Sequence, residues 1–533
     1  MVFNVLHLIK KSMKKILSVL FMAAFQMSTS FAQWSTVLNE NLIIANDSRI
    51  SNVLFDGAGF YFTWEDGSAG VFKHMVTRLN ADGTPNWTSS QVAHSHDLGS
   101  FTVSLQHSFV DASGNFIRVS SYAANTTSGL ASCANKISPT GTQMWNGQLG
   151  VEFTDGAMGA TIGASGNLYV LVGSNLLKIN DQGQVLWTSA LDPATTNTRE
   201  GKIVELSDGS VGVAYYRPGQ FNPTYGSYYI SIFDASGTRT TTGSQQIGPA
   251  SCSFYNPVYL TSNTNDELFF VFFDTNSSVA FVQKMIGDVP QLAGNGLAFD
   301  TSVNSKFVTA FKENNTLHLL YKYNWNSSDE GGVKLQSIDL NTFTTVYPAG
   351  SILFDQTTTN VSPLRNCFNS YNGSLGFLMV DNVSKEVTFQ TILNGALSST
   401  FQMCTSASDK GLAALSVGAG EVVAFLEDYR NGISNSPTNV AQNLNSGGNN
   451  VEEGGESFAL SVYPNPASTS FKIRVSPNSM GSAYGIYDMT GKCLERGVVL
   501  NETMSFNSTH WPSGMYFVRI GDHVAKVSIV SEN

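Results

Sequence analysis

The chain has 533 residues and a formal net charge of −11, and only 13% of its residues are charged. This length exceeds that of one typical domain, so several folding units or a repeat array are expected. Gly, Ser, Thr, Asn and aromatic residues are abundant, which favours short strands and polar turns over surface helices. The acidic balance argues against nucleic acid as a partner. We predict an all-β protein.

The N-terminus has the order of a secretory signal peptide. A lysine-rich stretch precedes an apolar run from Ile16 to Phe25, and small residues surround Ala32. The apolar run is too short to span a bilayer comfortably, and no later segment reaches about 20 apolar residues. We predict that residues 1–32 are a signal peptide, that the Sec machinery exports the chain, and that the mature protein is soluble.

Five cysteines are scattered along the chain without a CxxC pair, which argues against a zinc or iron–sulfur site. Their odd number leaves at least one unpaired in a monomer. A disulfide between Cys367 and Cys404 is one arrangement, and buried free thiols are the other. We favour the free thiols.

One phrase recurs between residues 33 and 445: a Gly, Asn or Asp turn leads into a run of apolar or aromatic residues. Successive copies begin about 43 to 58 residues apart, which is typical of propeller blades. The copies open at residues 57–62, 113–117, 165–170, 208–211, 265–270, 314–319, 372–377 and 418–423.

A second phrase places a Gly turn before a tryptophan in three early copies, ending at Trp87, Trp145 and Trp187. A hairpin that reverses there would direct a large ring into the packing between neighbouring blades. We therefore assign these rings to the core and not to a ligand platform.

The first and last copies also share an acidic turn, at Glu65-Asp66 and Glu427-Asp428. The last copy resembles the D-x-R-x-G phrase of secreted Bacteroidetes propellers. A ring of repeats buries sheet faces and removes exposed edges. We predict an all-β fold, with a β-propeller of seven or eight blades over residues 33–445. An open β-solenoid or stacked sandwiches are the alternative.

Residues 446–457 are rich in Gly, Asn and Glu, which is typical of a linker. Residues 458–533 then show short strands separated by turns, which predicts a small β-sandwich. This segment resembles the type A C-terminal sorting domain of the type IX secretion system. The matching motif includes Tyr463, Pro464, Asn465, Pro466, Gly491, Gly514, Tyr516 and Lys526.

The resemblance implies a Bacteroidetes-type bacterium and a route through the periplasm. It implies recognition by the type IX translocon and delivery to the outer cell surface or the medium. Members of this family are commonly cleaved and attached to a surface lipopolysaccharide. Such a domain directs export, and it gives no information on the chemical activity of residues 33–445.

His94, His96 and Asp97 form the densest group of metal-ligand types, with His107 nearby. Alternate residues of a strand point to one face, so His94 and His96 could share a metal. A polar loop between blades is the alternative and the favoured interpretation.

The acidic pairs could bind calcium or supply an acid and a base for glycoside hydrolysis. However, neighbouring residues of a strand face opposite ways. We favour a structural turn, with Arg430 as a salt-bridge partner of the second pair.

The stretch from Tyr215 to Tyr229 is rich in aromatic residues and long for its blade. At a propeller rim, Tyr216, Arg217 and Tyr225 could stack on a sugar or bind a peptide. A hairpin with buried rings is the alternative. The loop position makes it the best candidate for a recognition surface.

The chain lacks nucleophile elbows, HExxH helices, P-loops and dinucleotide-binding loops, so no catalytic residue is assigned. We expect no cofactor, with calcium as the alternative. A non-enzymatic binding protein, with a glycan or protein ligand, is favoured over a carbohydrate-active or other hydrolytic propeller. A spacer or adhesin is a third hypothesis.

Overall fold

The computed structural model describes most of the chain between residues 42 and 529. The described ranges are 42–46, 48–66, 71–97, 106–123, 130–145, 151–153, 157–191, 198, 200–219, 225–240, 244–253, 256–299, 306–324, 332–347, 350–354, 361–418, 421–429, 438–444, 460–463, 467–475, 480–488, 492–501, 503–520 and 523–529. The predicted signal peptide and the predicted linker lie outside them. The chain divides into two compact units, residues 1–449 and 450–533.

The N-terminal unit repeats one motif, an antiparallel meander whose strands pair in chain order. The first repeat contains β2 (Ser48–Phe55), β3 (Gly59–Asp66), β4 (Val71–Asn80) and β5 (Gln91–Asp97). The second contains β6 (Gln106–Val110), β7 (Phe116–Ala123), β8 (Leu130–Ile137) and β9 (Val151–Phe153). The third contains β10 (Ala157–Ile162), β11 (Leu168–Val172), β12 (Asn175–Ile179) and β13 (Val185–Ala190).

The fourth and fifth repeats are joined into one ten-stranded sheet. The fourth contains β14 (Gly201–Glu205), β15 (Val211–Pro218), β16 (Tyr225–Phe233) and β17 (Gln245–Gln246). Strand β18 (Cys252–Ser253) pairs with both repeats and bridges them. The fifth contains β19 (Tyr259–Ser262), β20 (Leu268–Asp274), β21 (Val279–Ile286), β22 (Val289–Pro290) and β23 (Leu297–Ala298).

Three further repeats complete the N-terminal unit. The sixth contains β24 (Lys306–Glu313), β25 (Thr316–Tyr323), β26 (Gly332–Asp339), β27 (Thr344–Thr345) and β28 (Ser351–Phe354). The seventh contains β29 (Val361–Tyr371), β30 (Ser374–Asp381), β31 (Val387–Leu393) and β32 (Ala396–Cys404). The last sheet has the order β1-β35-β34-β33, from β33 (Lys410–Gly418), β34 (Glu421–Asp428), β35 (Thr438–Asn443) and the N-terminal strand β1 (Leu42–Asn46).

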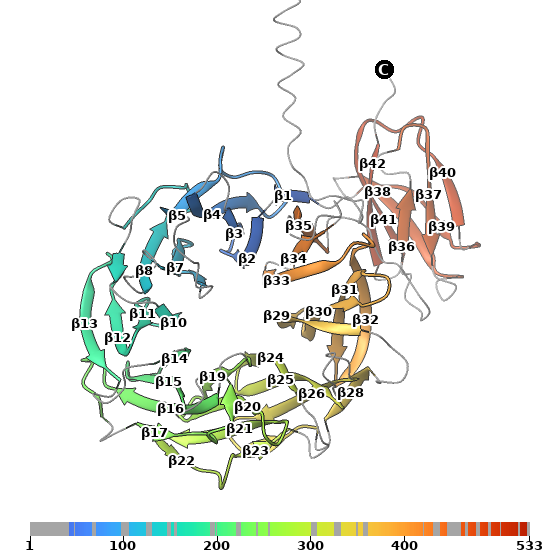
Figure 1. Cartoon of the computed structure of the whole chain (residues 1–533). Helices are drawn as coiled ribbons and strands as arrows, with labels where there is room; N and C mark the ends of the chain where they lie inside the picture. Colours follow the sequence, from blue (N-terminus) through green and yellow to red (C-terminus); the bar gives the residue numbers. More distant parts are fainter. Residues whose placement is uncertain are drawn as a thin grey trace, which may run out of the picture. The chain divides into compact units, whose positions relative to one another are not determined.

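The repeats form a closed ring. The first strand of each repeat contacts the first strand of the next, in the order β2, β6, β10, β14, β19, β24, β29 and β33, and β33 returns to β2. Figure 1 shows this arrangement, with β10, β14 and β29 on the inside and β13, β22 and β32 on the outside. The body is therefore a β-propeller, and its closure excludes the open solenoid.

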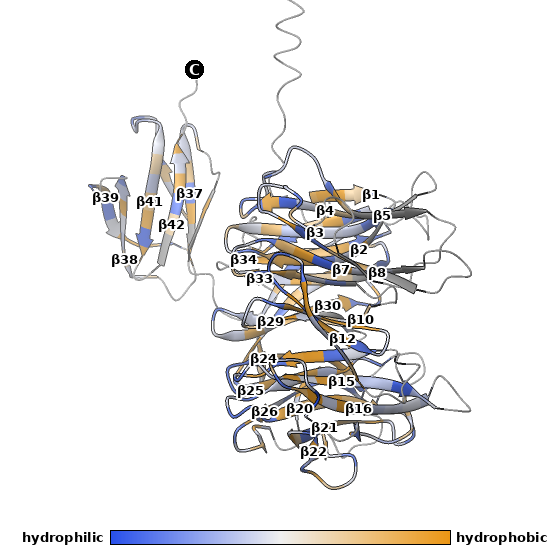
Figure 2. Cartoon of the chain, turned by 90° about the vertical axis from the view of Figure 1, so that its left-hand side faces the viewer, coloured by the Kyte–Doolittle hydropathy of each residue, from blue (hydrophilic) through white to orange (hydrophobic). Residues whose placement is uncertain are grey.

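The core of the N-terminal unit lies between neighbouring sheets. Residues of β3 pack on β34 across the closing interface, and residues of β11 pack on β7 and on β15. Because both faces of a sheet are covered, strands such as β11 and β20 are buried along their whole length. Figure 2 shows hydrophobic colour over part of β24 and hydrophilic colour over the rest of that strand.

Local turn chemistry explains the first hairpin of the repeats. Seven of the eight predicted openings lie at described turns before the second strand of a repeat, and the eighth lies between β33 and β34, where residues 419–420 are outside the described residues. These turns use residues that adopt a left-handed backbone at low cost, such as Gly166 with φ +77° and Gly373 with φ +75°. The periodic sequence phrase is therefore the first hairpin of each repeat.

The meander gives the propeller two different faces. Turns from the first to the second strand and from the third to the fourth lie on one face, which we call the turn face. Connections from the second to the third strand, and from one repeat to the next, lie on the other face, which we call the crossover face. Glu200, Tyr225 and the C-terminal ends of β20 and β34 lie on the crossover face.

The cysteines occur as free thiols. Cys367 and Cys404 belong to the same buried cluster, without the disulfide considered from the sequence. Burial raises the pKa of the Cys367 thiol above its usual range, which disfavours the reactive thiolate. The buried cysteines therefore act as small apolar residues.

The C-terminal unit is a β-sandwich of two antiparallel sheets. One sheet contains β36 (Leu460–Tyr463), β37 (Ser470–Val475) and β40 (Thr503–Asn507). The other has the order β39-β38-β41-β42, from β38 (Ala483–Asp488), β39 (Cys493–Val498), β41 (Gly514–Ile520) and β42 (His523–Ile529). Its core is a single cluster that includes Phe471, Ile486 and Val518. Among the described residues of the whole chain, no helix is long and apolar enough to cross a membrane.

Candidate functional site

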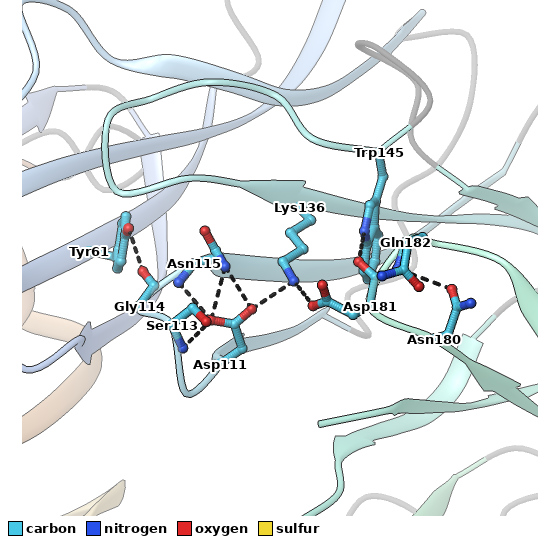
Figure 3. A network of polar contacts seen from close by, with 10 residues as sticks. All are labelled: Tyr61, Asp111, Ser113, Gly114, Asn115, Lys136, Trp145, Asn180, Asp181 and Gln182. Atoms are coloured by element: carbon cyan, nitrogen blue, oxygen red, sulfur yellow. Dashed lines mark hydrogen bonds and ion pairs between the residues drawn. The ribbon is translucent and has the colours of Figure 1, made fainter. Parts of the chain in front are cut away.

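The charged groups of the turn face connect neighbouring repeats (Figure 3). Lys136 Nζ lies 2.7 Å from Asp111 Oδ2 and also pairs with Asp181 of the third repeat. Burial lowers the pKa of Lys136, but its bonds to the two carboxylates outweigh this effect and raise it overall. Nearby, Trp145 Nε1 donates a 2.8 Å hydrogen bond to the Asp181 carbonyl. These groups are occupied in holding the ring together.

The three tryptophans of the repeat phrase serve the same purpose. Trp87 Nε1 donates to the Pro139 carbonyl at 2.8 Å, and Trp187 Nε1 donates to the Ala235 carbonyl at 3.2 Å. In each case, as at Trp145, the acceptor is in the hairpin turn of the next repeat. The prediction that these rings pack between blades is confirmed.

The acidic pair Glu427-Asp428 also has a structural role. Glu427 Oε1 accepts a 3.1 Å hydrogen bond from the Ile50 amide of the first repeat. Asp428 faces the other way, where Ser408 donates to it and Lys410 Nζ lies 3.8 Å from its Oδ1. The two carboxylates are therefore not a catalytic pair. The predicted partner Arg430 lies outside the described residues.

The aromatic hairpin is formed by β15 and β16, and its residues divide between two faces. Tyr216 lies on one face of the hairpin and is fully buried, and the centre of its ring is 5.3 Å from that of the Tyr228 ring. Arg217 lies on the opposite face with its guanidinium 4.3 Å from the centre of the Tyr229 ring. Tyr225 begins β16 and is 40% exposed. The register places Tyr225 on the face of Arg217, so two of the three predicted residues come together.

His94, His96 and Asp97 lie on β5, where the structure describes their backbone but not their side chains. The register pairs His94 with His74 of β4. Within the described residues, no three His, Cys, Asp or Glu side chains gather to hold a metal ion. The metal site therefore stays a prediction.

His74 itself is part of a buried polar cluster. Its Nδ1 lies 2.9 Å from the Arg118 guanidinium, which can only donate, so Nδ1 accepts and the imidazole is neutral. Glu65 Oε1 is 3.9 Å from the same nitrogen, too far for a hydrogen bond. Burial lowers the pKa of Arg118 to about 10, and the Glu65 carboxylate opposes this shift.

One polar group on the crossover face was not predicted from the sequence. Glu200 precedes β14, and its Oε1 lies 3.3 Å from Lys202 Nζ. Tyr228 donates its hydroxyl to Glu200 Oε2 at 3.2 Å. Burial raises the pKa of Glu200, although Lys202 and Tyr228 oppose the shift. Tyr228 belongs to the aromatic stretch noted in the sequence, whereas Glu200 and Lys202 have no local motif that could have identified them.

His107 lies on the inner strand β6, and its Nε2 is buried without a hydrogen-bond partner. Burial, together with the positive charge of Lys202, lowers the pKa of His107 to about 3. The imidazole is therefore neutral at physiological pH. A neutral imidazole, as at His107, and a carboxyl group of raised pKa, as at Glu200, are both features that a catalytic site could use.

The C-terminal unit has a packed aromatic corner. Tyr516 of β41 is buried, and its hydroxyl donates a 2.6 Å hydrogen bond to the Pro512 carbonyl. The Trp511 ring lies 5.1 Å from the Tyr516 ring and 5.7 Å from that of Phe471. Residues 461–530 match the family model described as the secretion system C-terminal sorting domain.

The C-terminal unit is a sorting domain. Its presence means that the protein is exported by the type IX secretion system to the cell surface or the medium. Of the predicted motif residues in this sorting domain, Gly514 begins β41, Tyr516 is buried and Lys526 is exposed on β42. Tyr463 ends β36 and only its backbone is described. Pro464, Asn465, Pro466 and Gly491 lie outside the described residues.

Several solved structures are similar to the chain. PorZ, an essential bacterial surface component of the type IX secretion system of Porphyromonas gingivalis, is 11% identical, with 91% of this chain and 70% of that chain covered and a TM-score of 0.38. The propeller of the Trilobed protease from Pyrococcus furiosus is 9% identical, with 75% and 93% covered and a TM-score of 0.38. AztD of Citrobacter koseri is 8% identical, with 86% and 99% covered and a TM-score of 0.40. No curated protein sequence matches the chain.

Proposed function

We propose that the propeller is a recognition protein that works outside the cell and binds a glycan or protein through the hairpin of β15 and β16. The observation that carries the proposal is the position of Arg217, which is stacked 4.3 Å from the Tyr229 ring centre beside the exposed Tyr225. Its guanidinium is also 5.6 Å from the centre of the Tyr215 ring. A leader over residues 1–32 and an origin in a Bacteroidetes-type bacterium belong to the same proposal.

The stacking prepares this arginine for binding. A guanidinium held against aromatic rings has lost conformational freedom before a ligand arrives, so less entropy is lost on binding. Arg and Tyr are also the residue types that contribute most energy to interfaces. The hairpin is at the crossover face, where long connections leave room for a partner.

The proposal is tested on the propeller, residues 33–445, with panels of polysaccharides and peptides, in the presence and absence of calcium. We expect the double variant Arg217→Ala, Tyr225→Ala to weaken binding about tenfold or more. Val383→Ala is the matched control, because Val383 is a 75% exposed apolar residue at a second-to-third-strand connection on the same face. Equal binding by the double variant and the control would disprove the proposed surface.

A hydrolytic propeller is the second candidate, and the Glu200 group favours it. A carboxyl group of raised pKa can act as a general acid, as required for glycoside hydrolysis. Turnover of the same panels is the discriminating measurement. Activity that Glu200→Gln abolishes would support an enzyme, whereas binding without turnover would support recognition.

A further inference from the structure

We infer that the ion pair of Glu200 and Lys202 on the crossover face is a binding site for an acidic sugar, whose carboxylate replaces that of Glu200 at the Lys202 ammonium. Glu200 Oε1 and Lys202 Nζ lie 3.3 Å apart, and the Lys202 side chain is 35% exposed, so a ligand can reach it. Glu200 meets Tyr228, which lies on the face of the β15–β16 hairpin opposite Arg217. The site is therefore distinct from the proposed hairpin surface.

Glu200 is held in position by groups other than Lys202. Its backbone carbonyl accepts a 2.8 Å hydrogen bond from the amide of Tyr216, whose ring packs on that of Tyr228. Its Oε2 accepts a 3.2 Å hydrogen bond from the Tyr228 hydroxyl, whereas Oε1 faces Lys202. When a ligand carboxylate takes the place of Oε1, Glu200 keeps both of these hydrogen bonds. We therefore expect the exchange to leave β14 and the hairpin in place.

The internal carboxylate makes this exchange depend on pH. Burial raises the pKa of Glu200, and Lys202 and Tyr228 oppose the shift without cancelling it. As the pH falls through the raised value, Glu200 loses its charge, whereas a sugar carboxylate with a pKa of about 3.5 stays ionised. The ligand then no longer competes with Glu200 for the Lys202 ammonium. The affinity for an acidic sugar should therefore rise on acidification.

Other titratable groups packed near the pair keep one charge state over the same pH range. Burial raises the pKa of Tyr228 well above its usual value, and it raises that of Cys252 to about 12. Burial and the Lys202 charge lower the pKa of His107 to about 3, so its imidazole stays neutral. A change of affinity between about pH 5.5 and about pH 8 is therefore assigned to Glu200.

His107 indicates a sugar, because it offers a second polar contact. Its Nε2 is buried without a hydrogen-bond partner among the described residues, which is costly unless another molecule supplies one. The strands β6 and β14 lie on either side of β10, and the Lys202 charge acts on His107 across it. At this end β10 and β14 are in close contact, since a Cβ atom at Gly159 would lie 2.3 Å from the Gly201 carbonyl oxygen. A hydroxyl both donates and accepts, so it fits either tautomer of the imidazole. A carboxylate for Lys202 and a hydroxyl for His107 together define an acidic sugar.

The test is calorimetric titration of the chain from residue 33 to residue 533 with oligomers of galacturonate and of glucuronate. We expect at least one of these acids to bind about tenfold more tightly at about pH 5.5 than at about pH 8. The methyl esters keep the hydroxyls and lose the charge, and they should not bind. Polyglutamate has carboxylates without hydroxyls and should bind about tenfold more weakly than the sugar. Binding of neither acid, or equal binding of ester or polyglutamate, would overturn the inference.

Glu200→Gln is the decisive variant, because the amide keeps the size of the side chain and removes its charge. It should bind the acidic sugar at about pH 8 as tightly as the wild type does at about pH 5.5. Glu267→Gln is the matched control, since Glu267 forms a 2.8 Å ion pair with Lys284 on the turn face, and it should leave binding unchanged. A pH response that persists in Glu200→Gln would overturn the inference.

Two further variants separate this site from folding and from the hairpin. Lys202→Met should abolish binding of the acidic sugar, whereas Lys202→Arg should retain it, and both should melt as the wild type does. Retained binding by Lys202→Met would contradict the proposed contact. The double variant Arg217→Ala, Tyr225→Ala should keep the pH response, so failure of the hairpin proposal and failure of this inference give different results.

Discussion

At the scale of single residues, the two carboxylates around Lys136 differ in environment. The Asp111 side chain is 8% exposed, whereas that of Asp181 is 64% exposed. A buried ion pair that loses one partner leaves an uncompensated charge, but an exposed pair contributes little. The two aspartates therefore make a natural comparison within one network.

We expect Asp111→Asn to lower the free energy of unfolding by about 2 kcal/mol, less than the loss of an isolated buried partner because Asp181 still holds Lys136. The matched variant Asp181→Asn should cost less than about 1 kcal/mol. Urea denaturation at neutral pH measures both. Equal effects of the two variants would show that burial does not decide how much each ion pair with Lys136 stabilises the fold.

The same pair gives a pH dependence. Burial raises the pKa of Asp111, but its bonds from Lys136 and Asn115 outweigh this and hold it below 3.8. A carboxyl group whose pKa is lower in the folded than in the unfolded protein stabilises the fold at pH values above its unfolded pKa. This contribution is lost as the pH falls through the folded pKa. The difference between wild type and Asp111→Asn should therefore shrink below about pH 3.8.

At the scale of structural elements, a hairpin turn of one repeat contacts the tryptophan ring of the preceding repeat. Gly183 has φ +77°, and a Cβ atom there would lie 2.9 Å from Trp145 Cγ. Gly166 has the same φ, but nothing lies within 4 Å of its Cβ position. Both glycines are at hairpin turns of the third repeat.

We expect Gly166→Ala to cost about 1 to 2 kcal/mol, because an L-residue is strained in a left-handed conformation. Gly183→Ala should cost about 1 to 3 kcal/mol more, because its methyl group displaces Trp145. Thermal and urea unfolding of the two variants measure the difference. If both variants lose the same stability, the indole does not depend on contact with this turn.

At the scale of the whole propeller, the N-terminal strand completes the last sheet. β1 pairs with β35 in the last sheet, and Leu42 and Ile44 pack against the cluster that joins the last repeat to the first. Without β1, strand β35 would become an edge and this cluster would lose apolar cover. Closure therefore joins residues at opposite ends of the body.

We expect a propeller that begins at residue 48 to melt on the order of 5 °C below one that begins at residue 33. A protein that begins at residue 42 is the matched control, since it keeps β1 and should melt like the longer form. Differential scanning calorimetry of the three proteins makes the comparison. A melt that does not change on removal of β1 would mean that closure by this strand adds no stability.

The repeat hairpins could be predicted because their signal is local: a residue such as Gly373 that tolerates a left-handed backbone precedes an apolar strand. The strand β1 could not, because its partner Ala441 is far away in the sequence and four apolar residues followed by Asn46 give little periodicity. Similarly, Glu200 meets Tyr228 only through the pairing of β14, β15 and β16. Tyr216 and Arg217 lie on opposite faces because side chains alternate along a strand, and this placement follows once the bounds of the strand are known.

The position of β35 also has a mechanical consequence. A force transmitted from the sorting domain would enter the propeller at residue 444, directly after β35. That strand lies between β1 and β34, so a pull along its axis would load two hydrogen-bond ladders in shear. A strand at the edge would instead be resisted by one ladder. The last strand of the propeller is therefore held by two ladders against a pull on the chain that follows it.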